Sequence, residues 1–160
     1  LDLKQASAQA SAVALALSEQ FPRHEATVMS RLQDLREDLD TLDTAMKAAA
    51  LALGQTTAIT SHPVYHYWSR AYELVTPSLL WEPGNEISPQ DIAALAGIRK
   101  EHPDAKFFIW ESTPLARNVK ILKEAGLTSI IISPCANQPV NGDFLTVMRQ
   151  NITALEALGD

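Results

Sequence analysis

The 160-residue sequence is short of cysteine, of glycine and of long apolar runs, and each shortage excludes a class of protein. Its single cysteine, Cys135, rules out an internal disulfide and any metal site built from several thiolates. Its six glycines form neither a Gly-x-Gly-x-x-Gly pattern nor a P-loop, which argues against a phosphate cradle. No run of about 18 uninterrupted apolar residues occurs, so we expect no membrane-spanning segment.

Basic residues are also few and scattered. The chain carries 13 lysines and arginines against 19 acidic residues, a net charge of −6, so a nucleic-acid partner is not expected. Hydrophobic residues make up 46% and charged residues 20%, as in an ordinary globular domain with a substantial core. No base or electropositive setting accompanies Cys135, which we interpret as a passive thiol.

Two helical patterns open the chain. Residues 3–20 predict an amphipathic helix that Pro22 ends, and residues 23–53 predict a helix of about 45 Å. The longer pattern has one narrow apolar seam that includes Leu35, Leu39 and Leu42. Such a seam is typical either of a coiled-coil arm that dimerises or of a helix that lies along one lobe and continues to another.

From residue 55 onward, short apolar runs alternate with helical patterns. This order predicts an α/β fold with a small four-stranded parallel or mostly parallel sheet covered by helices. Strands are expected at 56–60, 77–81, 106–110 and 129–132. A first helix is expected at 63–74 with Tyr67 inward, and a second begins with a capping box formed by Ser88 and Asp91. A third is expected to run from a Thr113 cap to Gly126. The last is expected to run from an Asp143 cap to Leu158, with Phe144 inward.

Open α/β sheets bind ligands at the carboxyl ends of their strands. Four predicted strands end at His62, Glu82, Glu111 and Ser133, so these residues are the candidates for a site. His62 offers an imidazole nitrogen that suits zinc. It could instead be a helix-capping or buried structural histidine, and the residues alone leave both interpretations open.

The two glutamates and a second histidine carry alternatives of their own. Glu82 and Glu111 could be metal ligands, a general acid/base pair, or groups that orient an imidazole; each could instead accept hydrogen bonds from the helix start that follows it. His66 lies four residues after His62, a spacing at which two histidines can share a metal, although an exposed His66 fits the sequence as well.

Three phrases of the sequence resemble the solute-binding proteins of zinc- and manganese-type metal-ion ABC transporters. They are Ser-His-Pro-Val-Tyr-His-Tyr-Trp at 61–68, Glu-Pro-Gly-Asn-Glu-Ile-Ser-Pro at 82–89, and Phe-Ile-Trp-Glu-Ser at 108–112. The resemblance covers essentially the whole chain and implies the carboxyl-terminal lobe of a two-lobe protein. It assigns 1–22 to a helix that belongs with a first lobe absent from this chain, 23–54 to the connecting helix, and 55–160 to the second lobe.

The resemblance also implies residue roles. His62 matches the family's third metal ligand, and its imidazole favours zinc, with manganese as the alternative. Glu111 matches an acidic residue that orients the site, and Ser133 stands where manganese-type members place an aspartate. As an isolated lobe the chain is expected to bind metal weakly or to be unoccupied.

Two functions therefore remain for comparison with the structure. The first is non-enzymatic capture of a metal ion, with zinc favoured, and its delivery to an ABC permease. This function is expected in the periplasm or outside the cell. The protein would then contact the membrane only through that permease or an anchor outside this chain. The alternative is an α/β enzyme or receiver-like domain that uses Glu82 and Glu111 and dimerises through its helical arm.

Overall fold

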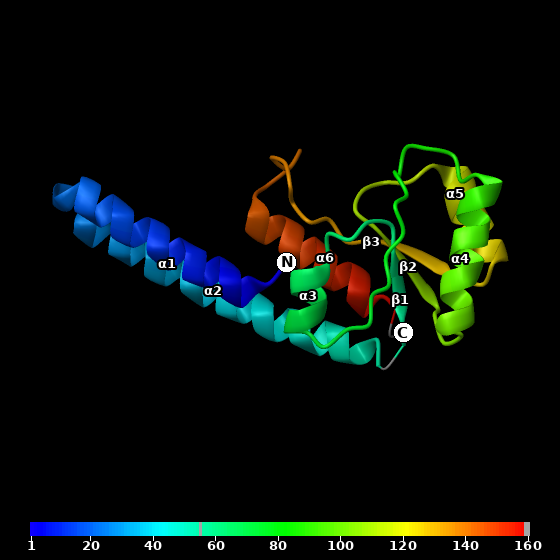
Figure 1. The fold of residues 1–160 in the computed structure, drawn as a ribbon. Coiled ribbons are helices and arrows are strands. Elements are labelled where there is room, and N and C mark those ends of the chain that lie inside the picture. The colour runs from blue at the N-terminus through cyan, green and yellow to red at the C-terminus, as the bar shows by residue number, and fades with distance from the viewer. Residues whose placement is uncertain (55, 159–160) are drawn as a thin grey trace.

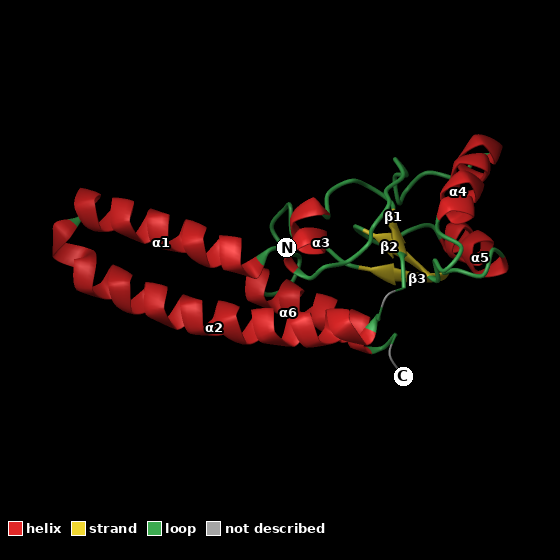
Figure 2. Ribbon diagram, turned by 60° about the horizontal axis from the view of Figure 1, so that its bottom comes forward, coloured by secondary structure: helices red, strands yellow, loops and turns green. Residues whose placement is uncertain are grey.

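The chain begins with a long helical hairpin. A computed structural model describes residues 1–54 and 56–158, so residues 55 and 159–160 of the predicted segment 55–160 lie outside the description. Helix α1 (Leu3–Gln20) and the single turn η1 (Pro22–His24) lead into α2 (Glu25–Ala52), and α1 lies alongside α2 for its whole length, extending away from the sheet (Figures 1 and 2). Both predicted helices are confirmed.

The half of α2 nearest the sheet belongs to the core of the lobe. Leu39, Leu42 and Met46 are buried there in one cluster with Met148 of helix α6 (Phe144–Glu156). The first residues of α1 join the same cluster through Leu3, which is 1% exposed. The part of the predicted seam from Leu39 onward thus packs against the chain's own lobe.

The sheet has three parallel strands in the order β1-β2-β3. They are β1 (Ala58–Thr60), β2 (Phe107–Trp110) and β3 (Thr128–Ile131). The strand predicted at 77–81, the second of four in chain order, is wrong: the segment makes one parallel bridge, between Ser78 and Thr60, at the open side of β1. Pro77 has no N–H to donate to a ladder, which confines this segment to the edge of the sheet.

Helices cover both faces of the sheet, as the uninterrupted apolar run of β2 predicts. Phe108 and Trp110 pack in one cluster with Leu95 of α4 (Pro89–Glu101) and Leu122 of α5 (Ala116–Glu124). Ile109 packs on the opposite face, where α2, α6 and the short α3 (His66–Ala71) lie (Figure 1). The α/β class is confirmed.

Local chemistry explains two helix starts that the sequence predicts correctly and one that it does not. Ser88 and Asp91 form the expected capping box, and Asp143 accepts a hydrogen bond from the backbone N–H of Thr146. Thr113 does not cap α5, which begins only at Ala116. The backbone N–H of Leu115 instead donates to Pro83 O at 3.0 Å, and Leu115, in extended backbone, takes the N-cap position.

Two predicted inward positions are wrong. Tyr67 is 61% exposed; α3 begins three residues later than predicted and turns Trp68, the next residue along the helix, into the core instead. Phe144 is 36% exposed because it occupies the first turn of α6, beyond the sheet, and Val147 takes the inward position. Neither difference alters the placement of the candidate site.

Candidate metal centre

Backbone pairing brings the four candidate residues to one edge of the molecule. The N–H of Trp81 donates to Ser61 O at 2.8 Å, and the N–H of Ser61 donates to Ile109 O at 2.8 Å. The N–H of Ile132 donates to Trp110 O at 2.9 Å. Because the segments run parallel, the residues that follow these pairs, His62, Glu82, Glu111 and Ser133, emerge together at what we call the carboxyl edge.

The imidazole of His62 lies between two carboxylates. Its Nε2 is 3.3 Å from Oε1 of Glu82, and its Nδ1 is 3.8 Å from Oε1 of Glu111. The His62 side chain is 19% exposed, whereas that of Glu82 is 61% exposed and that of Glu111 is 26% exposed. The ring therefore presents one nitrogen toward the open side of the edge and the other toward the interior.

The backbone at His62 is held by hydroxyl groups. Thr60 is fully buried, and its Oγ1 donates to His62 O at 3.1 Å while lying 2.8 Å from Oγ of Ser78. The Nδ1 atom of His62 is buried and has no hydrogen-bond partner among the described residues. A buried ring nitrogen without a close partner is unusual for a structural histidine, which normally satisfies both nitrogens.

Glu82 lies on a loop that the buried side-chain amide of Asn118 holds in place. Asn118 of α5 is fully buried; its Nδ2 donates to Asn85 O at 2.7 Å and its Oδ1 accepts from the N–H of Ile87 at 3.3 Å. Arg117 pairs with Glu86 on the same loop. Helix α4 is capped by its own serine and aspartate, so Glu82 does not serve the capping role that the sequence allowed.

Glu111 directly follows β2 and faces both the histidine and a buried tyrosine. Tyr65 is 1% exposed and donates its hydroxyl to Ile132 O at 2.7 Å. Burial, reinforced by the negative charge of Glu111, raises the pKa of the Tyr65 hydroxyl far above its ordinary value of 10.0. Tyr65 stays protonated and ties the segment after His62 to the end of β3.

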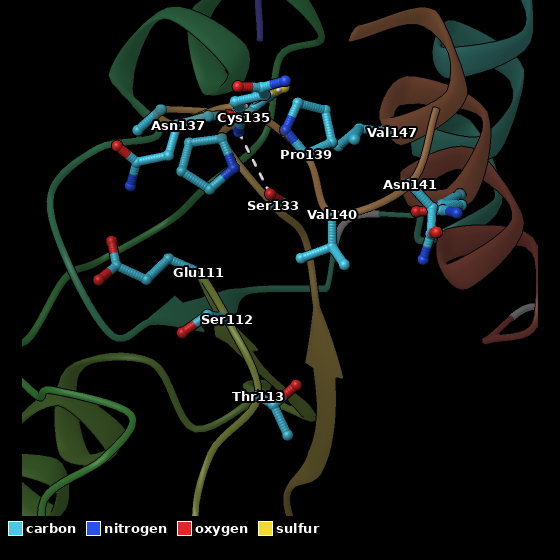
Figure 3. A pocket seen from close by; sticks show the side chains of 14 residues that line it. Glu111, Ser112, Thr113, Ser133, Cys135, Asn137, Pro139, Val140, Asn141 and Val147 are labelled. Carbon is cyan, nitrogen blue, oxygen red and sulfur yellow. Dashed lines mark hydrogen bonds between the residues drawn. The ribbon is translucent and has the colours of Figure 1, made fainter. Parts of the chain in front are cut away.

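Ser133 lies on the far side of Glu111 from the histidine. Both residues line an open pocket of about 570 Å³ whose other wall is the loop that follows β3 (Figure 3). The hydroxyl of Ser133 accepts from the N–H of Cys135 at 3.2 Å, which stabilises the start of this loop. His66 is exposed at the start of α3, and no hydrogen bond or ion pair between described residues joins it to His62.

Two asparagines that position the site were missed by sequence reasoning. Asn118 anchors the loop of Glu82, and Asn151, 3% exposed in α6, holds the backbone of Ser133. Each occupies an inward position of a helix whose other inward residues are apolar. An asparagine at such a position is the one signal from which they could have been found, because a buried amide requires partners.

The donor set at this edge suits a divalent cation but is incomplete. His62 and the two glutamates offer one imidazole and two carboxylates, the nitrogen and oxygen donors that zinc accepts. Nevertheless, residues 1–54 and 56–158 contain no group of three or more histidine, cysteine, aspartate or glutamate side chains arranged to hold a metal ion by themselves. The edge is at most part of a coordination sphere.

Comparison with models of protein families shows which family the chain belongs to. Residues 1–158 match the family model described as "ZnuA: Zinc-uptake complex component A periplasmic". The chain belongs to the ZnuA family. This membership confirms the predicted resemblance, and the family's description is that of a periplasmic zinc-uptake component rather than of an enzyme. The alternative of an enzyme or receiver-like domain is therefore set aside. No curated protein matches the chain.

Solved structures show the same fold in relatives of the family. The metal-dependent lipoprotein YcdH from Bacillus subtilis superposes with a TM-score of 0.84 at 19% identity, covering 98% of this chain and 61% of that one. The Zn(II)-bound ZnuA-like domain of Streptococcus pneumoniae AdcA gives 0.79 at 22% identity, covering 92% and 58%. The periplasmic zinc-binding protein TroA from Treponema pallidum gives 0.75 at 23%, covering 99% and 61%. The chain thus spans about three fifths of the length of these proteins.

Among the described residues, no helix combines the length and the apolar character needed to cross a membrane.

Proposed function

We propose that this chain is the connecting helix and second lobe of a protein that captures zinc and delivers it to an ABC permease. The observation that carries the proposal is the imidazole of His62, held at the carboxyl edge between two carboxylates with one nitrogen toward open space. Ligands bind at this edge in open α/β sheets, and neutral imidazole is a preferred zinc ligand. In this proposal His62 is a metal ligand, and the ion is cargo.

We divide the chain as the sequence suggests, with 1–22 packing against a first lobe outside these residues, 23–54 connecting, and 55–160 forming the second lobe. The end of the hairpin far from the sheet supports this division. Val13, Leu17, Phe21 and Met29 are between 40% and 58% exposed there. Apolar side chains exposed at one end of an element suit a surface that another domain or protein covers.

Zinc rather than manganese fits the side chains at the edge. Manganese favours carboxylate and water oxygens, and Ser133 supplies no carboxylate at the end of β3. Imidazole nitrogen at position 62 favours zinc. The remaining ligands would come from the first lobe, so the isolated chain binds zinc weakly.

Glu111 would serve as the orienting partner. A metal-bound histidine commonly donates its other ring N–H to a carboxylate, which fixes the tautomer and raises the basicity of the bound nitrogen. Nδ1 of His62 lies 3.8 Å from Glu111, close enough for a small rotation of either side chain to complete such a bond. Nε2 is then the nitrogen left for zinc.

The test is a zinc titration of the untagged 160-residue chain, monitored through the ring NMR resonances of its four histidines. We expect the ring of His62 to shift first and to saturate, with His24, His66 and His102 as internal controls. Manganese added at the same concentration should compete poorly. Unchanged His62 signals, or a His66 ring that shifts at lower zinc than His62, would contradict the assignment of His62 as the ligand. Tight 1:1 binding that His62→Ala alone abolishes would contradict the need for a first lobe.

A further inference from the structure

We infer that Glu82 is a second zinc ligand supplied by this lobe, which deepens the proposed function and rests on it. Three observations carry the inference: the separation of the two side chains, the anchoring of the loop on which Glu82 stands, and the charge that the edge presents. The second lobe then contributes two donors to the ion, one nitrogen and one oxygen, and the first lobe completes the coordination.

The separation matches a coordination geometry. Two ligands bound about 2.0–2.1 Å from a tetrahedral zinc ion lie about 3.3 Å apart. Nε2 of His62 and Oε1 of Glu82 are 3.3 Å apart. An ion can therefore enter between this nitrogen and this oxygen with little movement of either atom. By contrast, Glu111 lies beside the other ring nitrogen, Nδ1. An ion bound to Nε2 of His62 is therefore on the side of the ring that faces Glu82, not Glu111.

Glu82 is anchored at its backbone and free at its carboxylate. The N–H of the preceding residue, Trp81, pairs with Ser61 O at 2.8 Å, so positions 62 and 82 leave the sheet as neighbours. Below them the buried amide of Asn118 fixes the next turn of the loop through Asn85. The Glu82 side chain is nevertheless 61% exposed, and among described residues its carboxylate has no partner other than His62. A preorganised backbone with an accessible donor is what ion capture requires.

The charges at the edge also fit a divalent cation. Glu82 and Glu111 bring two negative charges within 4 Å of a ring that is neutral when it binds metal. A bound Zn²⁺ would balance them, and before it binds their net negative field attracts cations from solution. Glu86, on the same loop, is already paired with Arg117 and does not contribute to this field in the same way.

The test compares Glu82→Gln with the matched control Glu86→Gln in the 160-residue chain, with zinc chloride as the ligand and His62 ring shifts as the readout. Glutamine keeps the shape of the side chain and removes its charge. We expect Glu82→Gln to raise the dissociation constant of the His62 site at least about tenfold, and Glu86→Gln to leave it within about twofold. Because Glu82 is exposed, the variant should fold normally, which its circular dichroism spectrum checks.

A second measurement needs no variant. On the unmodified chain, the side-chain carboxyl carbon of Glu82 should shift with zinc along the same saturation curve as the His62 ring. If His62 responds while Glu82 does not, or if Glu82→Gln binds zinc like the unmodified chain, Glu82 is no ligand and the role of His62 stands. If His62 itself fails to respond, the proposed function falls and this inference falls with it.

Discussion

The side-chain amide of Asn151 holds the backbone of Ser133 by two hydrogen bonds. Its Oδ1 accepts from the N–H of Ser133 and its Nδ2 donates to Ser133 O, each at 2.8 Å. Asn151 is 3% exposed in α6, whereas Ser133 begins the loop that follows β3. One helix side chain thus sets the course of the chain as it leaves the sheet beside the candidate site.

Replacing Asn151 by alanine should therefore destabilise the lobe. The change leaves a partly buried N–H and a partly buried C=O without their amide partners, at a cost of about 2 kcal/mol in the free energy of unfolding. Urea denaturation checks this value. Asn137→Ala is the control, because Asn137 is exposed on the same loop and should change stability by less than about 0.5 kcal/mol. Equal effects of the two changes would contradict the role given to Asn151.

The two ends of α2 should respond differently to loss of a methionine. Met46 is fully buried in the lobe core, whereas Met29 near the far end is 40% exposed. We expect Met46→Ala to cost about 3 kcal/mol of unfolding free energy, and Met29→Ala less than about 1 kcal/mol. Thermal or urea unfolding measures both. Similar costs at the two positions would mean that the whole hairpin, not just its near half, is packed as core.

Glu111→Gln should weaken zinc binding without removing a ligand. Loss of the charge that orients a metal-bound histidine typically costs about 10-fold to 100-fold in affinity. Glu101→Gln is the control, since Glu101 is exposed at the end of α4. The zinc dependence of the His62 ring shifts provides the measurement. Unchanged affinity in Glu111→Gln would leave Glu111 without a role in the site.

The capping box of α4 predicts a pH dependence. Hydrogen bonds from the side chain and the backbone N–H of Ser88 lower the pKa of Asp91 below its ordinary value of 3.8. Because the folded-state pKa is the lower one, the stabilisation is complete above the unfolded value and is lost as the pH falls through the folded value. Asp91→Asn should melt at a lower temperature than the unmodified chain at about pH 7, and the gap should close as the pH falls below the lowered pKa of Asp91. A gap that is constant with pH would contradict this account.

Sequence reasoning reached the α/β class and the carboxyl edge because both depend on local patterns. The unbroken apolar run of β2 predicts burial on two faces, and parallel strands bring His62 and Glu111 to one edge whatever the side-chain details. The sequence did not predict the order of the strands in the sheet or the 3.3 Å distance between Glu82 and His62. Both depend on pairing between segments that are distant in the chain. The asparagine anchors were likewise hidden, since their partners are backbone atoms of remote loops.

The alternation along β2 has a consequence for how the site is assembled. Phe108 and Trp110 face one layer of helices while Ile109 faces the other, so a shift of pairing by a single residue would exchange the two sets. The same shift would carry Glu111 away from the imidazole. A chain with shifted pairing would therefore lose both its packed core and the carboxylate beside His62. Correct packing of the core thus also places Glu111 next to the imidazole.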